Sequence, residues 1–372
     1  MKILMIVPYF AESDRWMISG QKTAHALSKE HQVTVLTTGR EPGVRQLGPN
    51  LTVHRLKDIF LPDPINYSLI PGLFKAVRSI VKSQKPNICL INKHMFQTAW
   101  TVWTVKRLGV PVLVQTDTFP GISWFPRRKF VRLVMWLYAR LIGVPILRAA
   151  DKVILLHEGL VATAKQLGLN YQVIHNGIDL DHLATLKAPR DLVKPKDEVW
   201  VGYVGRLESI KGWYDLAAVA KELADQYPKV RWLFVGQNKV ASTRINAEFN
   251  HPNLIFLGQR TDALGIYQLL DVFVLPSYSE GLPNALMEAM ASGRCCLSSA
   301  VGGVKYLLKD EQSGLLFQPG NRQQLTKQLK RVLSDTQLRA KLGSQARKTI
   351  EQDYNLSKTT DQLNQLLAEY VS

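Results

Sequence analysis

The sequence predicts an α/β protein built from two doubly wound parallel sheets. Short apolar runs alternate with helical segments along the whole chain, and this alternation is typical of βαβ units in a parallel sheet. A polar stretch with two prolines, residues 187–198, separates two such series and has the composition of a linker. The length of 372 residues exceeds that of a typical single core. We therefore expect two domains, residues 1–185 and 186–354, followed by a final helical segment at 355–372.

The composition is that of an ordinary globular protein, except for its charge. Hydrophobic residues make up 46% of the chain and charged residues 21%, which argues against a disordered protein. The formal net charge is +17, and residues 1–185 carry most of it, with 23 basic and 11 acidic side chains. Such an excess favours an anionic partner: a membrane surface, a nucleic acid or an acidic ligand. Charge alone does not choose among them.

The cysteines and the first ten residues set further limits. Cys89, Cys295 and Cys296 do not have the spacing of metal ligands, and two of them are adjacent, so neither a zinc site nor a disulfide framework is expected. We interpret them as buried thiols in a reducing cytoplasm. The first residues form a short apolar run that ends at Pro8 without a small-residue cleavage site. They are predicted to be a first strand and not a signal peptide.

The first domain is predicted to open with a strand at 3–7, a helix at 22–30 and a strand at 33–37. Gly20 lies between the first strand and the helix, where backbone amides and the helix dipole can meet a phosphate. A plain tight turn is the alternative for this glycine. The remaining elements are strands at 51–56, 88–91, 111–114, 153–156 and 173–179, a helix at 74–82, and a surface loop at 61–72.

Two polar residues follow neighbouring predicted strands of this domain. His94 comes just after residues 88–91, and Asp117 just after residues 111–114. If the sheet is parallel, both face the crevice at the carboxyl ends of the strands. Asp117 can accept hydrogen bonds from hydroxyl groups there. A purely structural role is the alternative for each.

Residues 127–152 combine basic and aromatic side chains. The segment holds seven basic residues and one acid, and Arg132 and Arg140 interrupt its apolar run, so we do not expect it to span a bilayer. Arg128, Arg132 and Arg140 follow one stripe of a helix, while Trp136 and Tyr138 suit the level of lipid headgroups. The helix is predicted either to lie in a membrane interface or to pack its apolar side into the domain core.

The second domain repeats the alternation of strands and helices. Asp179 and Asp181, at the junction, form an Asp-x-Asp pair, which we interpret as capping a turn and not as a metal motif. A helix is predicted between Pro283 and Gly293, with Asn284 as its cap. The other elements are strands at 199–204, 231–235, 254–257, 272–275 and 295–298, helices at 213–227, 322–334, 337–352 and 356–370, and a tight turn at 301–304.

Four charged residues of this domain are placed at predicted strand ends or in a following helix. Arg206 and Lys211 follow strand 199–204, and an arginine fork with a lysine charge suits a diphosphate. Glu280 follows strand 272–275, and Glu288 lies eight residues later in the helix. Two solvated glutamates are the simpler interpretation of the pair alone. Together the four side chains could neutralise a diphosphate and bind the hydroxyl groups of a nucleotide sugar.

These motifs resemble those of the family 4 retaining glycosyltransferases, which have the GT-B fold. The resemblance rests on Gly205-Arg206 with Lys211-Gly212, on the two glutamates with seven residues between them, and on the string His-Asn-Gly-Ile-Asp at 175–179. Two positions depart from the family pattern. Ser19 replaces a second glycine of the first loop, and Asp117 stands where the family commonly has a histidine.

The resemblance implies two Rossmann-like domains that face each other across a cleft, and a retaining transfer from a nucleotide diphosphate sugar that needs no metal. Glu288 would hold the ribose and Glu280 the donor sugar, while the final helix would brace the first domain. The implied catalytic residues are Glu280, Arg206, Lys211, Asp117 and His94. The implied donor-binding residues are Gly20, Gly205, Arg206, Lys211, Gly236, Gly258, Gln259, Arg260, Glu280, Gly281, Leu282, Pro283, Asn284 and Glu288.

The partners expected from this reasoning are a UDP- or GDP-sugar and a glycan or lipid-linked acceptor at the cytoplasmic face of an anionic membrane. The donor is a substrate, so no cofactor is expected. Nucleotide-sugar epimerases and sugar phosphorylases of the same fold remain alternatives. A nucleic-acid-binding protein is disfavoured, because the basic residues form no recognised nucleic-acid-binding module.

Overall fold

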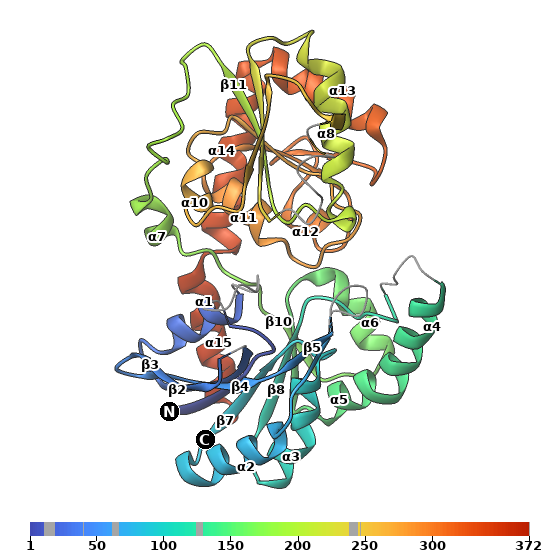
Figure 1. The fold of residues 1–372 in the computed structure, drawn as a ribbon. Coiled ribbons are helices and arrows are strands. Elements are labelled where there is room, and N and C mark those ends of the chain that lie inside the picture. Colours follow the sequence, from blue (N-terminus) through green and yellow to red (C-terminus); the bar gives the residue numbers. More distant parts are fainter. Residues whose placement is uncertain are drawn as a thin grey trace. The chain divides into compact units, whose positions relative to one another are not determined.

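The computed structural model describes residues 1–10, 19–39, 41–61, 67–123, 129–237, 245 and 247–371. The chain forms two compact units (Figure 1), one of Met1–Asn176 with Ser357–Ser372 and one of Gly177–Leu356. The expected boundaries followed residues 185 and 354, so the structure assigns the nine residues 177–185 and the two residues 355–356 to the second unit.

The first unit contains an eight-stranded sheet in the order β10-β9-β8-β7-β1-β2-β4-β3. Its described pairs are parallel, except that β3 joins β4 antiparallel at the edge. Strand order reverses between β1 and β7, which makes the sheet doubly wound, as predicted. The strands are β1 (Lys2–Ile6), β2 (Gln32–Gly39), β3 (Gly43–Gly48), β4 (Leu51–Lys57), β7 (Ile88–Asn92), β8 (Val112–Thr116), β9 (Lys152–Leu155) and β10 (Tyr171–Val173).

Helices cover both faces of this sheet, because its strands are apolar on both sides. One face packs against α1 (Ser19–Leu27) and α15 (Leu356–Ala368), and Leu363, Leu366 and Leu367 of α15 lie in one apolar cluster with Ile3 and Met5 of β1. The other face packs against α2 (Leu73–Gln84), α3 (Thr101–Arg107) and α5 (Val144–Ala149). A short helix, α6 (Val161–Gln166), links β9 to β10.

The second unit contains a six-stranded sheet in the order β13-β12-β11-β14-β15-β16, and its described pairs are all parallel. Strand order reverses between β11 and β14, so this sheet is doubly wound too. The predicted fold class is therefore confirmed. The strands are β11 (Val199–Val204), β12 (Val230–Val235), β13 (Leu254–Gly258), β14 (Val272–Leu275), β15 (Cys295–Ser299) and β16 (Leu315–Phe317).

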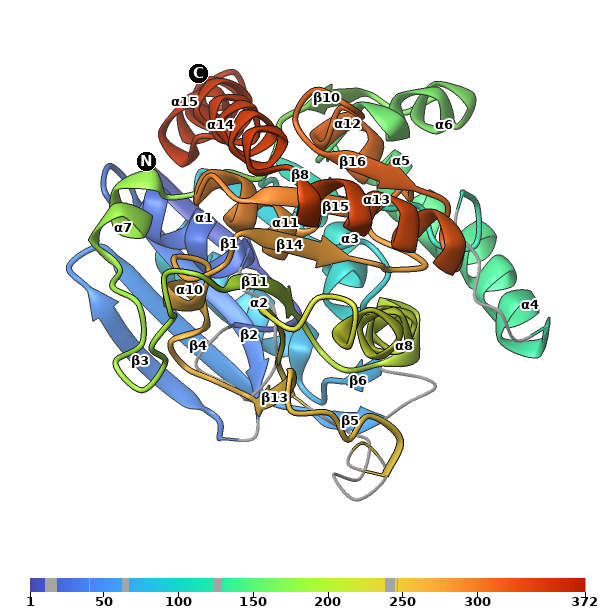
Figure 2. The same ribbon diagram turned by 90° about the horizontal axis from the view of Figure 1, so that it is seen from above.

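Helices lie on both faces of the second sheet (Figure 2). Two apolar clusters fill the space between these helices and the sheet, one on each face. The first includes side chains of α8 (Trp213–Ala224) and α13 (Arg322–Ser334), and the second includes side chains of α10 (Ala263–Ile266), α11 (Asn284–Ala291) and α12 (Val304–Leu307). Helix α14 (Thr336–Asp353) contributes Leu342 to the first cluster and Ile350 to the second. These layers hold the strand ends of the sheet in fixed positions.

Some local predictions were wrong. The expected loop at 61–72 contains strand β6 (Tyr67–Leu69), which pairs antiparallel with β5 (Ile59–Leu61). The prolines of this stretch indicated a loop. None of the paired residues is a proline, so each of them keeps the backbone amide that strand pairing uses. Helix α1 begins at Ser19 and ends at Leu27, three residues earlier at each end than predicted. The predicted strand at 173–179 is wrong beyond Val173, which is the last residue of β10 (Tyr171–Val173).

Two capping predictions had opposite outcomes. Asp179 caps α7 (Leu180–Thr185), because its carboxylate accepts a 2.9 Å hydrogen bond from the amide of His182. Asn284 does not cap α11. Pro283 is the cap residue with extended backbone, and Asn284 is already helical. No side-chain hydrogen bond closes this helix end.

Candidate active site

The candidate site of the second unit lies where its strand order reverses. In a doubly wound sheet, ligands bind at the carboxyl ends of the strands beside this point. The two strands that flank it are β11 and β14. Arg206 and Lys211 follow β11, and Glu280 follows β14. The fold thus brings together three of the charged residues selected from the sequence.

Lys211 and Glu280 form an ion pair across this point. The ammonium nitrogen of Lys211 lies 2.8 Å from Oε1 of Glu280, and the side chains are 22% and 8% exposed. The same carboxylate oxygen accepts a 2.7 Å hydrogen bond from the hydroxyl group of Ser277. This pairing between residues 69 positions apart was not predicted. It keeps a cation and a carboxylate in fixed positions at the strand ends.

Backbone contacts join the two loops that carry this pair. The amide of Tyr278 donates a 2.9 Å hydrogen bond to the carbonyl of Ile210. Gly212 has a φ of 64°, and a Cβ there would collide with the carbonyl oxygen of Pro276. Only glycine adopts this backbone and allows this approach without strain. The Lys-Gly motif therefore has a structural reason as well as a chemical one.

Arg206 is held from both its backbone and its side chain. Its guanidinium lies 2.6 Å from Oε2 of Glu208, and both side chains are 20% exposed. Its carbonyl accepts a 2.8 Å hydrogen bond from the hydroxyl group of Tyr203. The pKa of Tyr203 is raised well above its ordinary value, first by burial and then by the negative charge of Glu280. Glu208 and Tyr203 were missed in the sequence because neither is part of a motif.

Three glycines form the ends of the neighbouring strands. The amide of Gly205 donates to the carbonyl of Val235, and the amide of Gly236 donates to the carbonyl of Gly258, each at 2.8 Å. A Cβ on Gly236 would collide with the carbonyl oxygen of Gly205. A Cβ on Gly205 would lie 2.9 Å from the hydroxyl oxygen of Tyr203, whereas a Cβ on Gly258 would meet no described atom within 4 Å. Gly205 and Gly236 are therefore required by the close packing of the ends of β11 and β12.

Glu288 lies inside the protein and not on a solvated helix face. It is 7% exposed in α11, and Oε2 accepts a hydrogen bond of 3.4 Å from the hydroxyl group of Tyr267. Burial, followed by the charge of Glu288, raises the pKa of Tyr267 well above its ordinary value. A buried carboxylate needs such donors. The simpler interpretation, two solvated glutamates, is excluded by the low exposure of both Glu280 and Glu288.

The loop from Gly281 to Asn284 is fixed by a glycine turn after β15. The amide of Gly303 donates a 2.9 Å hydrogen bond to the carbonyl of Gly281, and a Cβ on Gly302 would collide with the carbonyl oxygen of Glu280. Leu282 is 6% exposed and belongs to the apolar core. The start of α11 has no side-chain cap, so its first amides are suited to an anion.

Three other predicted binding residues have different surroundings. Arg260 donates to Asp191 and Asp262 in paired hydrogen bonds, all of 2.8 Å, so its guanidinium links the end of β13 to the linker. Gln259 is exposed beside it. Gly20 belongs to the first unit, inside the first turn of α1, where a Cβ would lie 3.2 Å from a methyl carbon of Val7.

The first unit brings its two predicted residues to neighbouring strand ends. His94 follows β7 and Asp117 follows β8, and these strands are adjacent and parallel. His94 is only 2% exposed, and its Nδ1 lies 2.9 Å from the hydroxyl group of Thr116. Burial lowers the pKa of His94 to about 4, and Asp117 and Lys93 shift it in opposite directions. At neutral pH this imidazole is uncharged and enclosed.

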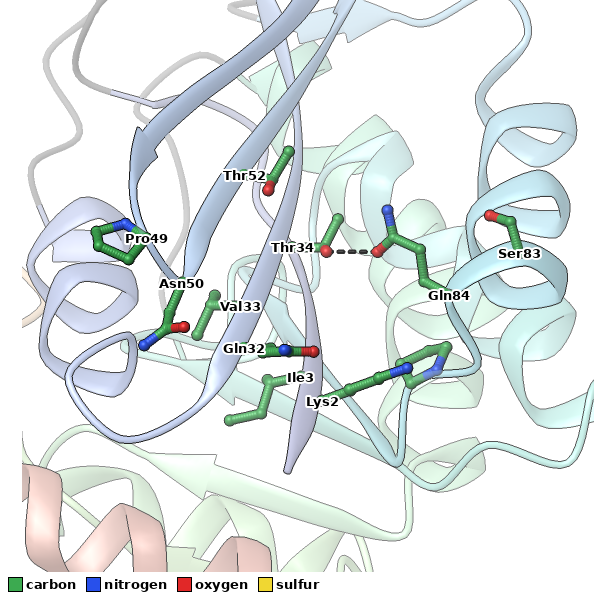
Figure 3. A pocket seen from close by; sticks show the side chains of 11 residues that line it. Lys2, Ile3, Gln32, Val33, Thr34, Pro49, Asn50, Thr52, Ser83 and Gln84 are labelled. Carbon is green, nitrogen blue, oxygen red and sulfur yellow. Dashed lines mark hydrogen bonds between the residues drawn. The ribbon is translucent and has the colours of Figure 1, made fainter.

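A polar hollow of about 400 Å³ lies elsewhere, at the amino ends of strands in the first unit (Figure 3). Its lining includes Lys2, Gln32, Thr34 and Gln84, and the hydroxyl group of Thr34 donates a 2.5 Å hydrogen bond to Gln84. Ligands of doubly wound sheets bind at the opposite edge, the carboxyl ends. We therefore assign the candidate site to the residues above and not to this hollow.

The chain matches two family models in succession. Residues 21–182 match the model described as "Glycosyltransferase Family 4", and residues 185–349 match the model described as "Glycosyl transferases group 1". Together the two models cover most of the chain.

Two bacterial relatives match over most of their length. A UDP-Gal:alpha-D-GlcNAc-diphosphoundecaprenol alpha-1,3-galactosyltransferase of Escherichia coli is 28% identical over 84% of this chain and 86% of its own. An alpha-1,4-N-acetyl-D-galactosaminyltransferase of Campylobacter jejuni, whose named acceptor is also linked to undecaprenol, is 25% identical over 93% of this chain and 92% of its own.

Two solved structures show the same fold. The sucrose-phosphate synthase of Thermosynechococcus elongatus matches with a TM-score of 0.80 and 22% identity over 99% of both chains. The Anabaena protein Alr3699/HepE in complex with UDP-glucose matches with a TM-score of 0.77 and 18% identity over 99% of this chain and all of its own.

Proposed function

We propose that this chain, which belongs to the group 1 glycosyltransferases of family 4, transfers a hexosyl group from a nucleotide diphosphate sugar to a lipid-linked glycan acceptor. The observation that carries this proposal is the Lys211–Glu280 pair of 2.8 Å at the strand-order reversal of the second sheet. It combines a phosphate-binding cation with a hydroxyl-binding carboxylate at the place where doubly wound sheets bind nucleotides.

Each charged residue has a role in holding the donor. Arg206 and Lys211 neutralise the diphosphate, and they stabilise the negative charge that grows on it as it departs. Glu280 accepts hydrogen bonds from the donor sugar, and the buried Glu288 binds the ribose hydroxyl groups. The acceptor hydroxyl attacks the face that the diphosphate leaves and gives its proton to an oxygen of the departing phosphate. The bond from the anomeric carbon to that phosphate is thus replaced by the glycosidic bond, and the anomeric configuration is retained. Glu280 is a binding group in this scheme and not a covalent nucleophile.

Arg206 and Lys211 also supply the positive charge that a divalent metal provides in other transferases. We therefore propose that transfer requires neither a metal nor a cofactor. Transfer should continue at an unchanged rate in EDTA. A requirement for added magnesium or manganese would contradict this part of the proposal.

The acceptor and the location are inferred from the first unit. Helix α4 (Lys129–Tyr138) has no buried residue among those described, and its Phe130 and Leu133 are 77% and 55% exposed. The following helix, α5, buries Val144, Ile146 and Leu147 in the core. Residues 127–152 were predicted either to lie in a membrane interface or to pack into the domain core, and the two alternatives thus apply to different halves of the segment. We propose that α4 lies in the cytoplasmic face of an anionic membrane, where the acceptor named for the Escherichia coli relative would be found.

The basic residues near α4 support an anionic surface. Lys129 and Arg132 belong to it, and the guanidinium of Arg140 lies 4.9 Å from the ring centre of Trp136. Arg128 lies outside the described residues. By length and composition, Lys129–Ala149 is the one helical stretch among the described residues that could cross a membrane. This criterion therefore does not support our expectation that Arg132 and Arg140 prevent the segment from crossing a bilayer. The proposed interfacial position depends instead on α5, the second half of the segment, which is buried in the domain core.

A donor panel tests the proposed reaction. The purified protein is incubated with UDP-, GDP- and ADP-hexoses, with and without a lipid-linked acceptor, and free nucleotide and glycolipid product are measured. We expect hydrolysis of one donor class and faster release with acceptor. Lys211→Ala and Glu288→Ala should each reduce both reactions at least about a hundredfold, which corresponds to about 3 kcal/mol of lost binding or transition-state stabilisation. Full activity in both variants would refute the assignment.

A further inference from the structure

Most of the exposed large apolar side chains in the described part of the chain belong to two places in the first unit. One is α4 with the helical turn after it, and the other is the two-stranded sheet of β5 and β6. Single exposed apolar side chains are ordinary on a protein surface, but a group of them marks an interaction surface. The proposed function uses α4 and leaves β5 and β6 without a role.

The pairing of β5 with β6 places apolar side chains on one face of their sheet. Ile59 is paired with Leu69, and Leu61 with Tyr67. Cross-strand partners share a face, and so do side chains two positions apart along a strand, so these four side chains point the same way. Ile59 and Leu69 are 57% and 42% exposed, while Leu61 and Tyr67 are half-buried. We call these four residues the hairpin face.

The opposite face of β5 and β6 is fixed to the rest of the first unit. Ser68 lies on this face and is only 2% exposed. Its hydroxyl group donates a 2.5 Å hydrogen bond to Oδ2 of Asp58. The amide of Ile70, directly after β6, donates a 2.6 Å hydrogen bond to Oε1 of Gln97. These polar contacts lie beneath the sheet, so the hairpin face is directed outwards.

Aromatic contacts join the hairpin face to α4. The ring centre of Tyr67 lies 6.5 Å from that of Tyr138, the last residue of α4, and the two rings are inclined by 74°. Tyr67 also stacks on Phe96 with a distance of 6.4 Å between the ring centres. Nε1 of Trp100 donates a 2.8 Å hydrogen bond to the hydroxyl group of Tyr138. The hairpin face and the end of α4 are therefore neighbours on one surface of the first unit.

The charges beside the hairpin face favour an anionic bilayer over a protein as its partner. Lys57 lies two residues before β5, and Lys75 lies in the first turn of α2, after β6; both are exposed. Lysine is depleted in protein–protein interfaces, whereas lysine beside exposed aliphatic and aromatic side chains is typical of surfaces that lie in a membrane interface.

The backbone of β5 and β6 limits the depth that the hairpin face can reach. The two strands form a sheet of their own, so the outer edge of each strand presents backbone groups that need water. The hydrocarbon region of a bilayer does not supply it, but the headgroup region does. The sheet therefore fits the headgroup level, with its apolar side chains directed towards the acyl chains.

We propose that the hairpin face is a second membrane-contacting element, beside α4, on an anionic bilayer. Ile59 and Leu69 enter the boundary of the acyl chains, and Lys57 and Lys75 lie among the lipid phosphates. A helix alone leaves the unit free to rotate about the helix axis, and a second contact removes this freedom. This inference rests on the proposed function, in which α4 contacts the same bilayer.

Fluorescent labels at single positions test the hairpin face. The three cysteines of the chain are buried, so a cysteine introduced at the surface reacts selectively. Leu69→Cys reports on the hairpin face and Leu133→Cys on α4. Val44→Cys is the control, because Val44 is 63% exposed on β3 of the same unit. Vesicles of phosphatidylglycerol and phosphatidylethanolamine that carry nitroxide lipids should quench the first two labels and leave the third unquenched.

The pattern of quenching separates this inference from the proposed function. Quenching at position 133 alone overturns the hairpin face as a membrane contact and leaves the position of α4 standing. Quenching at neither position overturns the membrane location in the proposed function as well. A label at position 69 that is shielded from water before vesicles are added would show that a second copy of the chain covers the hairpin face, and would also overturn the inference.

A paired variant measures the contribution of the hairpin face. Ile59→Ser with Leu69→Ser removes the apolar cross-strand pair, and binding to the same vesicles should weaken at least about tenfold, because two half-exposed aliphatic side chains lose their apolar environment. Val44→Ser should bind like the unmodified protein. Unweakened binding of the paired variant overturns the inference. Donor hydrolysis without acceptor should be equal in all these proteins; if the paired variant loses it through misfolding, the label at position 69 decides.

Discussion

The hydroxyl group of Tyr278 donates a 2.5 Å hydrogen bond to Oδ2 of Asp215. Tyr278 lies in the loop that carries Glu280, and Asp215 lies in the first turn of α8, where it is 8% exposed. The other carboxylate oxygen accepts a 2.8 Å hydrogen bond from Nε of Arg322 in α13. A buried carboxylate thus anchors the loop that carries Glu280 to two helices on one face of the sheet.

Removing this hydroxyl group should loosen the loop without removing a ligand contact. We expect Tyr278→Phe to raise donor KM about three- to tenfold, since a hydrogen bond to a charged group contributes about 1.5 kcal/mol. Donor hydrolysis kinetics measure the effect. Tyr171→Phe, on β10 of the first unit, is the control and should leave KM unchanged. Equal KM values for the two variants would show that the anchor does not position the loop.

Gly302 offers a test of the glycine turn beneath Glu280. Its φ is 48°, and a Cβ would collide with the carbonyl oxygen of Glu280. Gly302→Ala should therefore displace Glu280 and reduce donor hydrolysis at least about tenfold. Gly168→Ala is the matched control, because Gly168 has a φ of 65° and a Cβ added there would meet no described atom within 4 Å.

Both alanine variants carry the backbone strain of about 1 kcal/mol. If this strain dominates the loss of stability, the two variants should have similarly lowered melting temperatures. Donor hydrolysis should nevertheless fall only in Gly302→Ala. Similar losses of activity in both variants would mean that strain, and not the position of Glu280, limits the reaction.

Much of the fold could be predicted because glycine and proline residues mark where the apolar runs end. Strands β11 and β14 and helix α13 have the predicted bounds; Gly205 follows the first strand and Pro276 the second. Strand β3 was missed, since each of its residues is exposed or only half-buried and no apolar alternation marks it. It is a strand only because it pairs with β4 at the edge of the sheet, and no local sequence pattern shows this pairing.

The charged residues of the candidate site could be chosen from the sequence, but their partners could not. Lys211 and Glu280 were selected separately, and their ion pair depends on the strand order, which joins β11 directly to β14. Lys93 pairs with Asp117 through its ammonium and has a φ of 68°, and it escaped notice because neither feature has a sequence motif. The burial of His94 likewise follows from packing around the end of β7.

The buried His94 should make stability depend on pH. Its pKa is lowered by burial from 6.5 to about 4 in the folded protein, so the unfolded chain binds its proton more readily. Stability from this residue is complete above about pH 6.5 and is lost as the pH falls towards 4. The free energy of unfolding should be about 2 kcal/mol lower at pH 5 than at pH 7 because of His94 alone.

Urea unfolding of His94→Gln at these two pH values measures that contribution. The difference between pH 7 and pH 5 should shrink by about 2 kcal/mol relative to the unmodified protein. His25→Gln, at an exposed position of α1, should leave the difference unchanged. A pH dependence in His94→Gln equal to that of the unmodified protein would show that other groups cause it.

The exposed apolar side of α4 should determine membrane binding. Phe130 and Leu133 of α4 and Leu141 in the helical turn that follows it (Ala139–Gly143) are 77%, 55% and 72% exposed, so replacing all three with serine removes apolar surface without opening a cavity in the core. Flotation with vesicles of phosphatidylglycerol and phosphatidylethanolamine should recover the unmodified protein in the lipid fraction at low salt, and the triple variant mostly in the soluble fraction. Basic residues near the surface add about 1 kcal/mol each, so vesicles of neutral lipid alone should bind both proteins weakly.

Val193→Ser provides the control for α4, because Val193 is 81% exposed but belongs to the linker of the second unit. It should float like the unmodified protein. Donor hydrolysis without acceptor should be equal in all three proteins, because α4 belongs to the first unit and the residues proposed to bind the donor, Arg206, Lys211, Glu280 and Glu288, to the second. Recovery of the triple variant in the lipid fraction would show that α4 does not bind the membrane. Loss of donor hydrolysis in the triple variant would instead indicate that the exposed side chains support the fold, because a surface that only contacts lipid has no effect on a reaction in solution.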